Sequence, residues 1–234
     1  MKKALLIVIA LNTVFACNEA KVSPRLSSDS ILLQDSKKDE LKAETEPILL
    51  DNDTSLWKEL TADDSLLLDL RYATVNNFTD NQIYPCGRCF LRPVIADRIL
   101  QINRELRAQK KWQLKLFDCY RPRSAQQRLW DIHPNATHVT HPSKGSMHNR
   151  GAAVDLTIVT LEGNELDMGT DFDSFDKKAR HDFYGLDELI LNNRSYLKKI
   201  MERKGFKSIK SEWWHYSLSG QGSALSNWEW PCPE

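Results

Sequence analysis

The segment Gly151-Ala-Ala-Val-Asp-Leu-Thr-Ile-Val-Thr160 has the composition of a buried β-strand. Successive side chains of a strand point to opposite faces, so Ala153, Asp155 and Thr157 share one face. The other face carries only small or apolar side chains: Ala152, Val154, Leu156 and Ile158. Because an unpaired buried charge is very costly, a carboxylate on a strand whose opposite face is core must find a partner. The segment therefore predicts a central strand with a compensated acidic residue.

Helical and strand patterns surround this segment. Apolar residues at spacings of four, three and four predict an amphipathic helix just after Pro93, and another helical pattern ends at Gly205. Ser124 and Gln127 have the spacing of a capping box, which predicts a short helix ending near Trp130. Further strands are predicted over residues 66–72, 113–119 and 207–218. Because strands and helices mix without regular βαβ alternation, we expect a single α+β domain with a mainly antiparallel sheet flanked by helices.

The N-terminal segment has the features of an export signal. Lys2 and Lys3 precede an apolar run that is too short to span a bilayer, so residues 1–16 are predicted to be a signal peptide. Ala16 before Cys17 resembles a lipobox, in which Cys17 is lipidated; the alternative is an ordinary cleavage site at the same bond. Residues 17–52 are polar and predict a flexible tether, and residues 53–234 the globular domain. We expect an exported, periplasmic protein that is lipid-anchored to the cell envelope through Cys17.

Charge and cysteine content narrow the choice of partners. Lys+Arg and Asp+Glu number 32 each, so the charge balance gives no sign of a nucleic-acid partner, and nothing in the sequence implies a protein partner. Cys86-Gly-Arg-Cys89 has the spacing of half a zinc ribbon, but the sequence contains no second such pair. In an oxidising compartment, disulfides or buried thiols are therefore expected at Cys86, Cys89, Cys119 and Cys232, with the connectivity left open.

Two short motifs form a candidate metal site: His148-x-x-Gly151-x-Ala-x-Asp155 and Glu212-Trp-Trp-His215. Gly151 allows a backbone turn through which His148 can fold back toward Asp155. In a regular strand Glu212 and His215 face opposite sides, so they share a site only if Glu212 lies at an irregular strand entry. No HExxH motif is present, which argues against a helix-based zincin. Two imidazoles and one carboxylate leave a fourth position open, as in catalytic zinc sites.

With Ser146 at its start, the first motif reads Ser-x-His-x-x-Gly-x-Ala-x-Asp, and Glu-x-x-His follows downstream. This combination resembles the VanX-type D-alanyl-D-alanine dipeptidases and their carboxypeptidase relatives. Further segments extend the resemblance, in the expected order, across roughly residues 56–218: residues 69–78, Cys89-Phe-Leu-Arg92, Tyr120-Arg-Pro122 and Met168-Gly-Thr-Asp-Phe-Asp173. The resemblance implies that His148, Asp155 and His215 hold one Zn²⁺ and that Glu212 is the general base.

The same resemblance implies roles around the metal. Arg121 falls where the family places an arginine against the scissile carbonyl, Asp173 matches an acid at the substrate's free amino end, and Ser146 lines the cleft. The implied reaction is zinc-dependent hydrolysis of the small D,D-dipeptide D-alanyl-D-alanine, in peptidoglycan metabolism or in glycopeptide resistance.

Two alternatives stay open. One is a D,D-carboxypeptidase that trims peptidoglycan pentapeptides with the same chemistry. The other is a non-catalytic, envelope-tethered zinc module that binds peptidoglycan. Such a module would need neither Glu212 nor Arg121, and both residues stand in their motifs here, which favours the enzyme.

Overall fold

The computed structural model describes residues 56–218 and 224–233. The predictions for the signal peptide, the tether and Cys17 lie outside these residues. Within the described part of the chain, no helix is both long and apolar enough to cross a membrane.

A five-stranded sheet forms the centre of the domain, in the order β2-β4-β5-β7-β6. Its strands are β2 (Leu67–Leu68), β4 (Trp112–Asp118), β5 (Ala153–Thr160), β6 (Lys207–Ser208) and β7 (His215–Ser217). β2 is parallel to β4, and every other neighbouring pair is antiparallel. A separate antiparallel pair joins β1 (Lys58–Leu60) to β3 (Cys89–Leu91). The predicted α+β domain with a mainly antiparallel sheet is confirmed.

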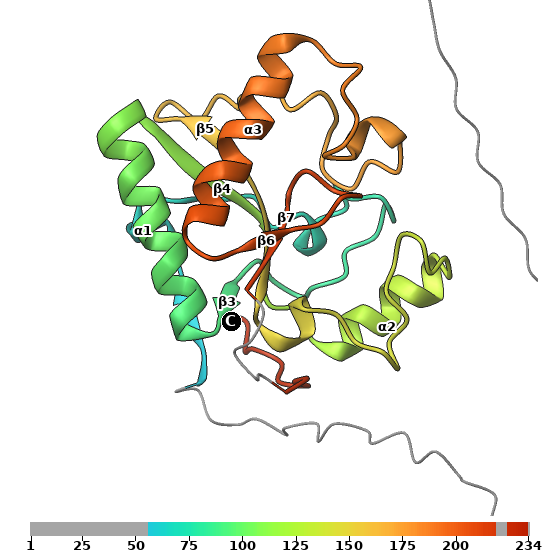
Figure 1. Cartoon of the computed structure of the whole chain (residues 1–234). Helices are drawn as coiled ribbons and strands as arrows, with labels where there is room; N and C mark the ends of the chain where they lie inside the picture. The colour runs from blue at the N-terminus through green and yellow to red at the C-terminus, as the bar shows by residue number, and fades with distance from the viewer. Residues whose placement is uncertain (1–55, 219–223, 234) are drawn as a thin grey trace, which may run out of the picture. The chain divides into compact units, whose positions relative to one another are not determined.

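The helices pack against this sheet. α1 (Pro93–Lys110) contacts β4, and α3 (Glu188–Arg203) contacts β6. The two helices lie side by side in Figure 1, and Arg203 Nη2 donates to Glu105 Oε1 across them at 2.6 Å. α2 (Arg123–Ile132) stands apart from both. Short 3₁₀ turns complete the order, at Ala62–Asp64, Arg71–Ala73, His148–Arg150 and Lys177–Ala179.

The apolar stripe predicted for the first helix faces the core, because α1 buries Ile95, Ile99, Ile102 and Leu106. Pro93 is the first residue of α1, where a missing N–H leaves no hydrogen bond unmade. β5 is buried from Ala153 to Val159 on both faces, which suits the central strand of a covered sheet. The sheet therefore carries Asp155 in its interior, with 3% of that residue exposed.

Two local predictions were wrong. The capping box at Ser124 does not form: Pro122 is the N-cap of α2 without a side-chain cap bond, and Ser124 Oγ instead donates to Glu229. The single strand predicted over residues 207–218 is broken into β6 and β7. Between them, backbone bonds go to a loop on another segment, where His181 N donates to Lys210 O and Trp213 N donates to Ala179 O.

Two disulfides cross-link the domain. Cys86–Cys232 ties the C-terminal segment to the loop before β3, and Cys89–Cys119 ties β3 to the end of β4. The two cysteines of the CxxC motif therefore have different partners and do not form half of a zinc ribbon. Each native cross-link of this kind typically stabilises a fold by about 2–4 kcal/mol.

Candidate active site

Three elements bring His148, Asp155 and His215 together. Asp155 lies on β5 and is the direct cross-strand partner of His215, the first residue of β7. His148 begins a 3₁₀ turn that ends at Gly151, whose φ of 66° lies in the left-handed region. A Cβ at Gly151 would also lie 2.3 Å from the Trp57 ring. Only glycine fits this turn without strain, and the turn points His148 back toward the strand.

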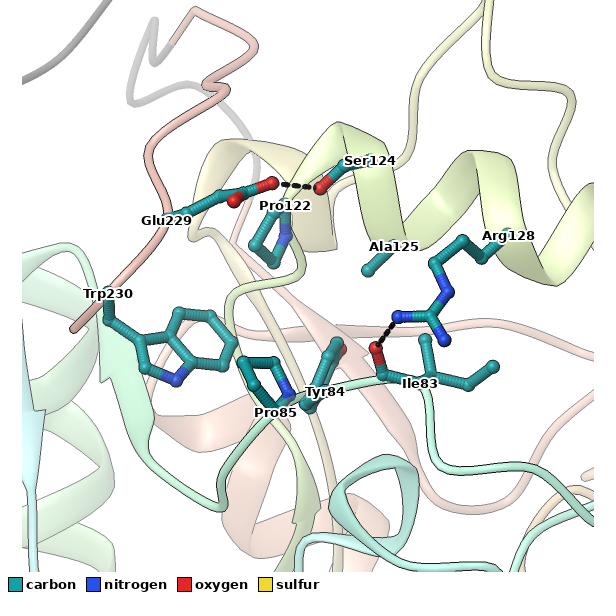
Figure 2. A pocket seen from close by; sticks show the side chains of 9 residues that line it. All are labelled: Ile83, Tyr84, Pro85, Pro122, Ser124, Ala125, Arg128, Glu229 and Trp230. Atoms are coloured by element: carbon teal, nitrogen blue, oxygen red, sulfur yellow. Dashed lines mark hydrogen bonds between the residues drawn. The ribbon is translucent and has the colours of Figure 1, made fainter. Parts of the chain in front are cut away.

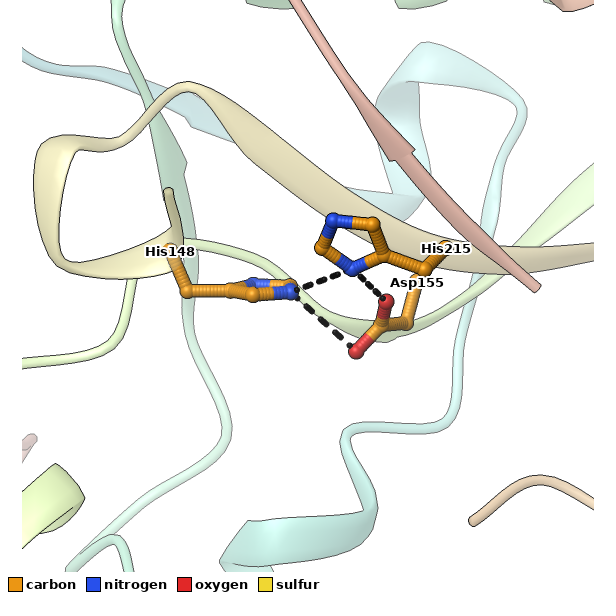
Figure 3. A group of neighbouring side chains, drawn as sticks. All are labelled: His148, Asp155 and His215. Carbon is orange, nitrogen blue, oxygen red and sulfur yellow. Dashed lines mark hydrogen bonds and ion pairs between the residues drawn. The ribbon is translucent and has the colours of Figure 1, made fainter. Parts of the chain in front are cut away.

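The three side chains face one point (Figure 3). His148 Nε2 lies 3.3 Å from Asp155 Oδ2, and His215 Nδ1 lies 3.0 Å from Asp155 Oδ1. The two imidazole nitrogens, His148 Nε2 and His215 Nδ1, are 3.1 Å apart. One ligand atom from each residue falls within 4.8 Å of the others, so the group could hold a metal ion. Two nitrogens and one carboxylate oxygen match a zinc site that leaves a fourth position open.

The electrostatics of the cluster suit a cation. Burial raises the pKa of Asp155, but the charges and hydrogen bonds of His148 and His215 outweigh it and hold that pKa below its usual range. Burial lowers the pKa of His148, yet the Asp155 carboxylate beside it raises that pKa overall. Asp155 is therefore the negative centre of the cluster.

A backbone carbonyl orients the first imidazole. His148 Nδ1 donates to Cys119 O at 2.7 Å, and Asp118 Oδ2 lies 3.4 Å from the same nitrogen. This contact places the proton on Nδ1 and leaves the Nε2 lone pair facing Asp155, the arrangement that metal-binding histidines use. The carbonyl is itself held in place, because Cys119 is bonded to Cys89.

Arg121 is anchored at the end of β4. Its Nε and Nη2 donate to Asp118 Oδ2 at 3.0 and 2.6 Å, and its Nη1 donates to Gln126 Oε1 at 3.0 Å. The other Asp118 oxygen accepts from Tyr84 Oη at 2.7 Å. Burial lowers the pKa of Arg121, but Asp118 and the tyrosines beside it raise it well above its usual value. The guanidinium is thus charged and fixed in orientation.

Glu212 lies before β7, in the irregular segment that separates it from β6. Its Oε2 is 4.0 Å from His215 Nδ1, so strand alternation does not keep the two residues apart. Burial and the nearby Asp155 carboxylate raise the pKa of Glu212 above its usual range. Trp213 Nε1 donates to Thr170 Oγ1 at 2.9 Å and fixes this segment.

Asp173 has no ion-pair partner among the described residues. Its carboxylate accepts a hydrogen bond from Tyr72 Oη at 2.7 Å. Burial, with help from the charges of Asp155 and Glu212, raises the pKa of Asp173 well above its usual value. A cation arriving beside Asp173 would relieve this destabilisation of the ionised form.

One cavity of about 300 Å³ collects every predicted site residue: Arg121, Ser146, His148, Asp155, Asp173, Glu212 and His215. We call it the metal cavity. Ser146 stabilises the turn that carries the first histidine, because its Oγ accepts from the His148 backbone N–H at 3.0 Å. The sequence places these residues up to tens of positions apart, and the sheet brings them to one cavity.

A second cavity of about 300 Å³ lies beneath Trp230 and contains none of these residues (Figure 2). We call it the tail cavity. Its two charged side chains bond to other lining residues: Ser124 Oγ donates to Glu229 Oε1, and Arg128 Nη1 donates to Ile83 O at 2.8 Å. It contains no histidine among its lining residues.

The whole described domain matches a known family. A family model described as D-ala-D-ala dipeptidase covers residues 57–232. The chain belongs to this family. A D-alanyl-D-alanine dipeptidase of Escherichia coli strain K12 is 36% identical over 155 residues, which cover 65% of this chain and 79% of that protein. One from Enterococcus faecium is 33% identical over 184 residues, covering 70% of this chain and 91% of that protein.

Among solved structures, a zinc-containing variant of the vancomycin-resistance D,D-pentapeptidase VanY is 16% identical, with a TM-score of 0.38. It covers 56% of this chain and 74% of that chain.

Sequence reasoning missed three residues that shape this dipeptidase-family site. Asp118 and Gln126 hold the Arg121 guanidinium, and Tyr72 holds the Asp173 carboxylate. Asp118 stands three residues before Arg121, so a motif read from Asp118 rather than from Tyr120 would have included it. Tyr72 and Asp173 are 101 residues apart, and no local spacing connects them.

Proposed function

We propose that this protein is a zinc peptidase that hydrolyses the D-alanyl-D-alanine dipeptide. The observation that carries the proposal is the placement of Glu212 and Arg121 in the same cavity as the metal-ligating set His148, Asp155 and His215. A peptidoglycan-binding module without catalysis needs the metal set alone. Membership of the dipeptidase family supports the same conclusion.

Zinc, held by His148, Asp155 and His215, would supply Lewis acidity and lower the pKa of bound water to about 7. Glu212 is the group that accepts the proton of the attacking water and then passes it to the leaving amine. Its pKa, raised by burial and by Asp155, makes its carboxylate a better proton acceptor than an exposed glutamate. Its 4.0 Å distance from His215 Nδ1 keeps it beside the metal set.

Arg121 stabilises the oxygen of the scissile carbonyl as negative charge develops on it. A guanidinium has five N–H donors, and those on Nε, Nη1 and Nη2 that bond to Asp118 and Gln126 occupy three of them. The two remaining N–H groups are available to the substrate. Because Asp118 fixes the guanidinium beforehand, little reorganisation is needed in the transition state.

Asp173 recognises the free amino end of the dipeptide. Its carboxylate accepts from a tyrosine hydroxyl but forms no ion pair with a described residue, and an ammonium group would supply that partner. A wall-bound pentapeptide has an amide at this position and gains no such ion pair. Asp173 therefore favours dipeptidase over carboxypeptidase activity, and Ser146 lines the same cleft.

We also propose that the enzyme works in the periplasm, in peptidoglycan metabolism or glycopeptide resistance. Residues 1–16 would direct export, and Cys17 with the 17–52 tether would anchor the domain to the envelope. The two disulfides support an oxidising compartment. If Cys17 is lipidated, Cys17→Ser should move the protein from the membrane fraction to the soluble periplasmic fraction, and an unchanged distribution would argue against the anchor.

The activity is tested by incubating the purified, zinc-loaded protein with D-Ala-D-Ala and with a muropeptide pentapeptide, with and without a chelator. We expect free D-alanine from the dipeptide, lost on chelation and restored by zinc. Release from the pentapeptide alone would identify a carboxypeptidase. Release from neither, with zinc bound, would leave the non-catalytic module.

A further inference from the structure

One amide side chain joins the two loops that carry Arg121 and His148. Asn149 follows His148 in the 3₁₀ turn and is completely buried, with 0% of the residue exposed. Its Nδ2 donates to Arg121 O at 2.8 Å, and its Oδ1 accepts from the Ser146 backbone N–H at 2.7 Å. These partners fix the orientation of the amide, because a carbonyl oxygen needs a donor and a backbone N–H needs an acceptor. Asn149 therefore holds the backbone of two residues that line the metal cavity.

Both backbone polar groups of Arg121 bond to the turn that carries the first histidine. Its N–H donates to His148 O at 3.1 Å, and its carbonyl accepts from the Asn149 side chain. His148 makes a further bond to the same segment, from Nδ1 to Cys119 O. The bonds of His148 cannot be removed by substitution without altering a proposed zinc ligand. The bond from Asn149 can, so its contribution to the site can be measured separately.

The side-chain partners of Arg121 do not fix its distance from the metal-ligating set. Asp118 and Gln126 hold the guanidinium, but both belong to the same stretch of chain as Arg121. They orient the guanidinium relative to that stretch, whereas its distance from His148 depends on how the stretch lies against the turn. In the proposed reaction both must reach one scissile carbonyl, and a displacement of about 1 Å can cost about 10²-fold in rate.

We propose that Asn149 is a positioning residue that sets the place of the Arg121 guanidinium relative to the metal-ligating set. The proposal rests on the proposed peptidase function, and Asn149 acts through Arg121, since it does not itself line the metal cavity. The turn is also held from the C-terminal segment, where the buried Ser226 donates from its backbone N–H to Asn149 O at 2.9 Å. Loss of the bond to Arg121 O therefore frees the Arg121 loop and leaves the turn in place.

A second buried asparagine provides the matched control. Asn103 on α1 is 1% exposed and makes the same two kinds of bond: its Nδ2 donates to Ser65 O, and its Oδ1 accepts from the Leu114 backbone N–H, both at 2.9 Å. It lines neither the metal cavity nor the tail cavity. Replacing either asparagine by aspartate keeps the size and the Oδ1 acceptor and removes the Nδ2 donor. Both variants lose stability, but only Asn149→Asp loses a bond to Arg121.

The test measures kcat, KM and zinc content for zinc-loaded wild type, Asn149→Asp and Asn103→Asp on D-Ala-D-Ala. We expect kcat to fall about ten- to a hundredfold in Asn149→Asp, with KM and zinc content near the wild-type values, because Arg121 acts on charge that develops in the transition state. Asn103→Asp should keep all three values. If either aspartate variant does not fold, Asn149→Ala and Asn103→Ala take the place of the pair. An unchanged kcat in the Asn149 variant, or an equal loss in the Asn103 variant, would overturn the proposal.

A double-mutant cycle separates positioning from a general structural role. In an Arg121→Ala background, Asn149→Asp should change kcat/KM by less than about threefold, since the group through which it acts is gone. The same fold-loss in both backgrounds would show that Asn149 supports the fold alone.

Hydrogen exchange tests the link between the loops without any turnover. If wild type does not hydrolyse the dipeptide, the proposed function fails by itself, and the exchange rate of the Arg121 backbone N–H decides about Asn149. The same measurement replaces the cycle if Arg121→Ala has no measurable turnover. Faster exchange of this N–H relative to the amides of β5 in Asn149→Asp, but not in Asn103→Asp, supports the proposal. An equal relative rate in the two variants contradicts it.

Discussion

The metal cavity and the tail cavity have the same volume, about 300 Å³, but their acidic side chains have different surroundings. In the tail cavity both charged side chains have a hydrogen-bond partner in the cavity wall: Glu229 accepts from Ser124 Oγ, and Arg128 donates to Ile83 O (Figure 2). In the metal cavity Asp173 forms no ion pair with a described residue, and burial with neighbouring negative charge raises the pKa of both Asp173 and Glu212. Acids with raised pKa values, rather than cavity size, therefore distinguish the candidate active site from the tail cavity.

The largest difference between the two cavities is expected when His215, a proposed zinc ligand, is removed from one and the Ser124 hydrogen bond is removed from the other. His215→Ala should lose both bound zinc and activity, because two donors do not make a catalytic site. Ser124→Ala should keep zinc and turnover and lose only about 1 kcal/mol of stability. Elemental analysis, D-alanine release and urea unfolding of the two variants measure these effects. Full zinc content in His215→Ala would remove the metal assignment.

Because Asp173 has no ion-pair partner among the described residues, its removal should change kcat/KM by an amount that depends on the substrate. Asp173→Ala should reduce kcat/KM for D-Ala-D-Ala about ten- to a hundredfold, since hydrogen bonds to charged groups contribute roughly 1.5–3 kcal/mol. An N-acylated analogue has no ammonium to pair, so its kcat/KM should change much less. Steady-state kinetics on both substrates decide the matter. Equal losses would mean that Asp173 supports the fold, and the carboxypeptidase alternative would regain support.

His181, a half-buried group outside both cavities, predicts a smaller effect on stability. Burial, with help from Lys198 and Arg194, lowers the pKa of His181 to about 4, against 6.5 when unfolded. Between these values the unfolded chain binds the proton more readily, so the free energy of unfolding should fall as pH drops from about 6.5 toward 4. The half-buried position limits this loss to about 2 kcal/mol.

His181→Gln should remove this part of the acid sensitivity. Urea unfolding of wild type and variant at pH 7 and pH 4.5 measures the stability lost by each protein between the two pH values. Subtracting the two losses cancels the titration of all other groups. An equal loss of stability in both proteins would show that His181 is not the group responsible.

The sequence predicted well those features that depend on local spacing. The apolar stripe of α1 follows from a periodicity of 3.6, and the buried strand with Asp155 follows from a periodicity of 2. Short motifs identified His148 and His215 as candidate site residues. The predictions of strands were wrong where distant segments compete for the same backbone hydrogen-bonding groups. The loop at Ala179 takes the Trp213 N–H and breaks the strand predicted over residues 207–218.

Contacts between distant positions account for the rest. Disulfide pairing was not predictable, because four cysteines allow three connectivities. The Phe175 ring contacts the rings of Phe78 and His138, and no periodicity connects these three residues. Such groups are visible only once the sheet has brought the loops together.

Glu212→Gln tests whether Glu212 is the general base at the site of His148, Asp155 and His215. The change keeps the size of the side chain and removes the proton acceptor. We predict that this variant retains one zinc per chain while kcat on D-Ala-D-Ala falls about 10²- to 10⁴-fold. A variant that keeps zinc and most of its kcat would assign the base to another residue, and one that loses zinc would make Glu212 a ligand.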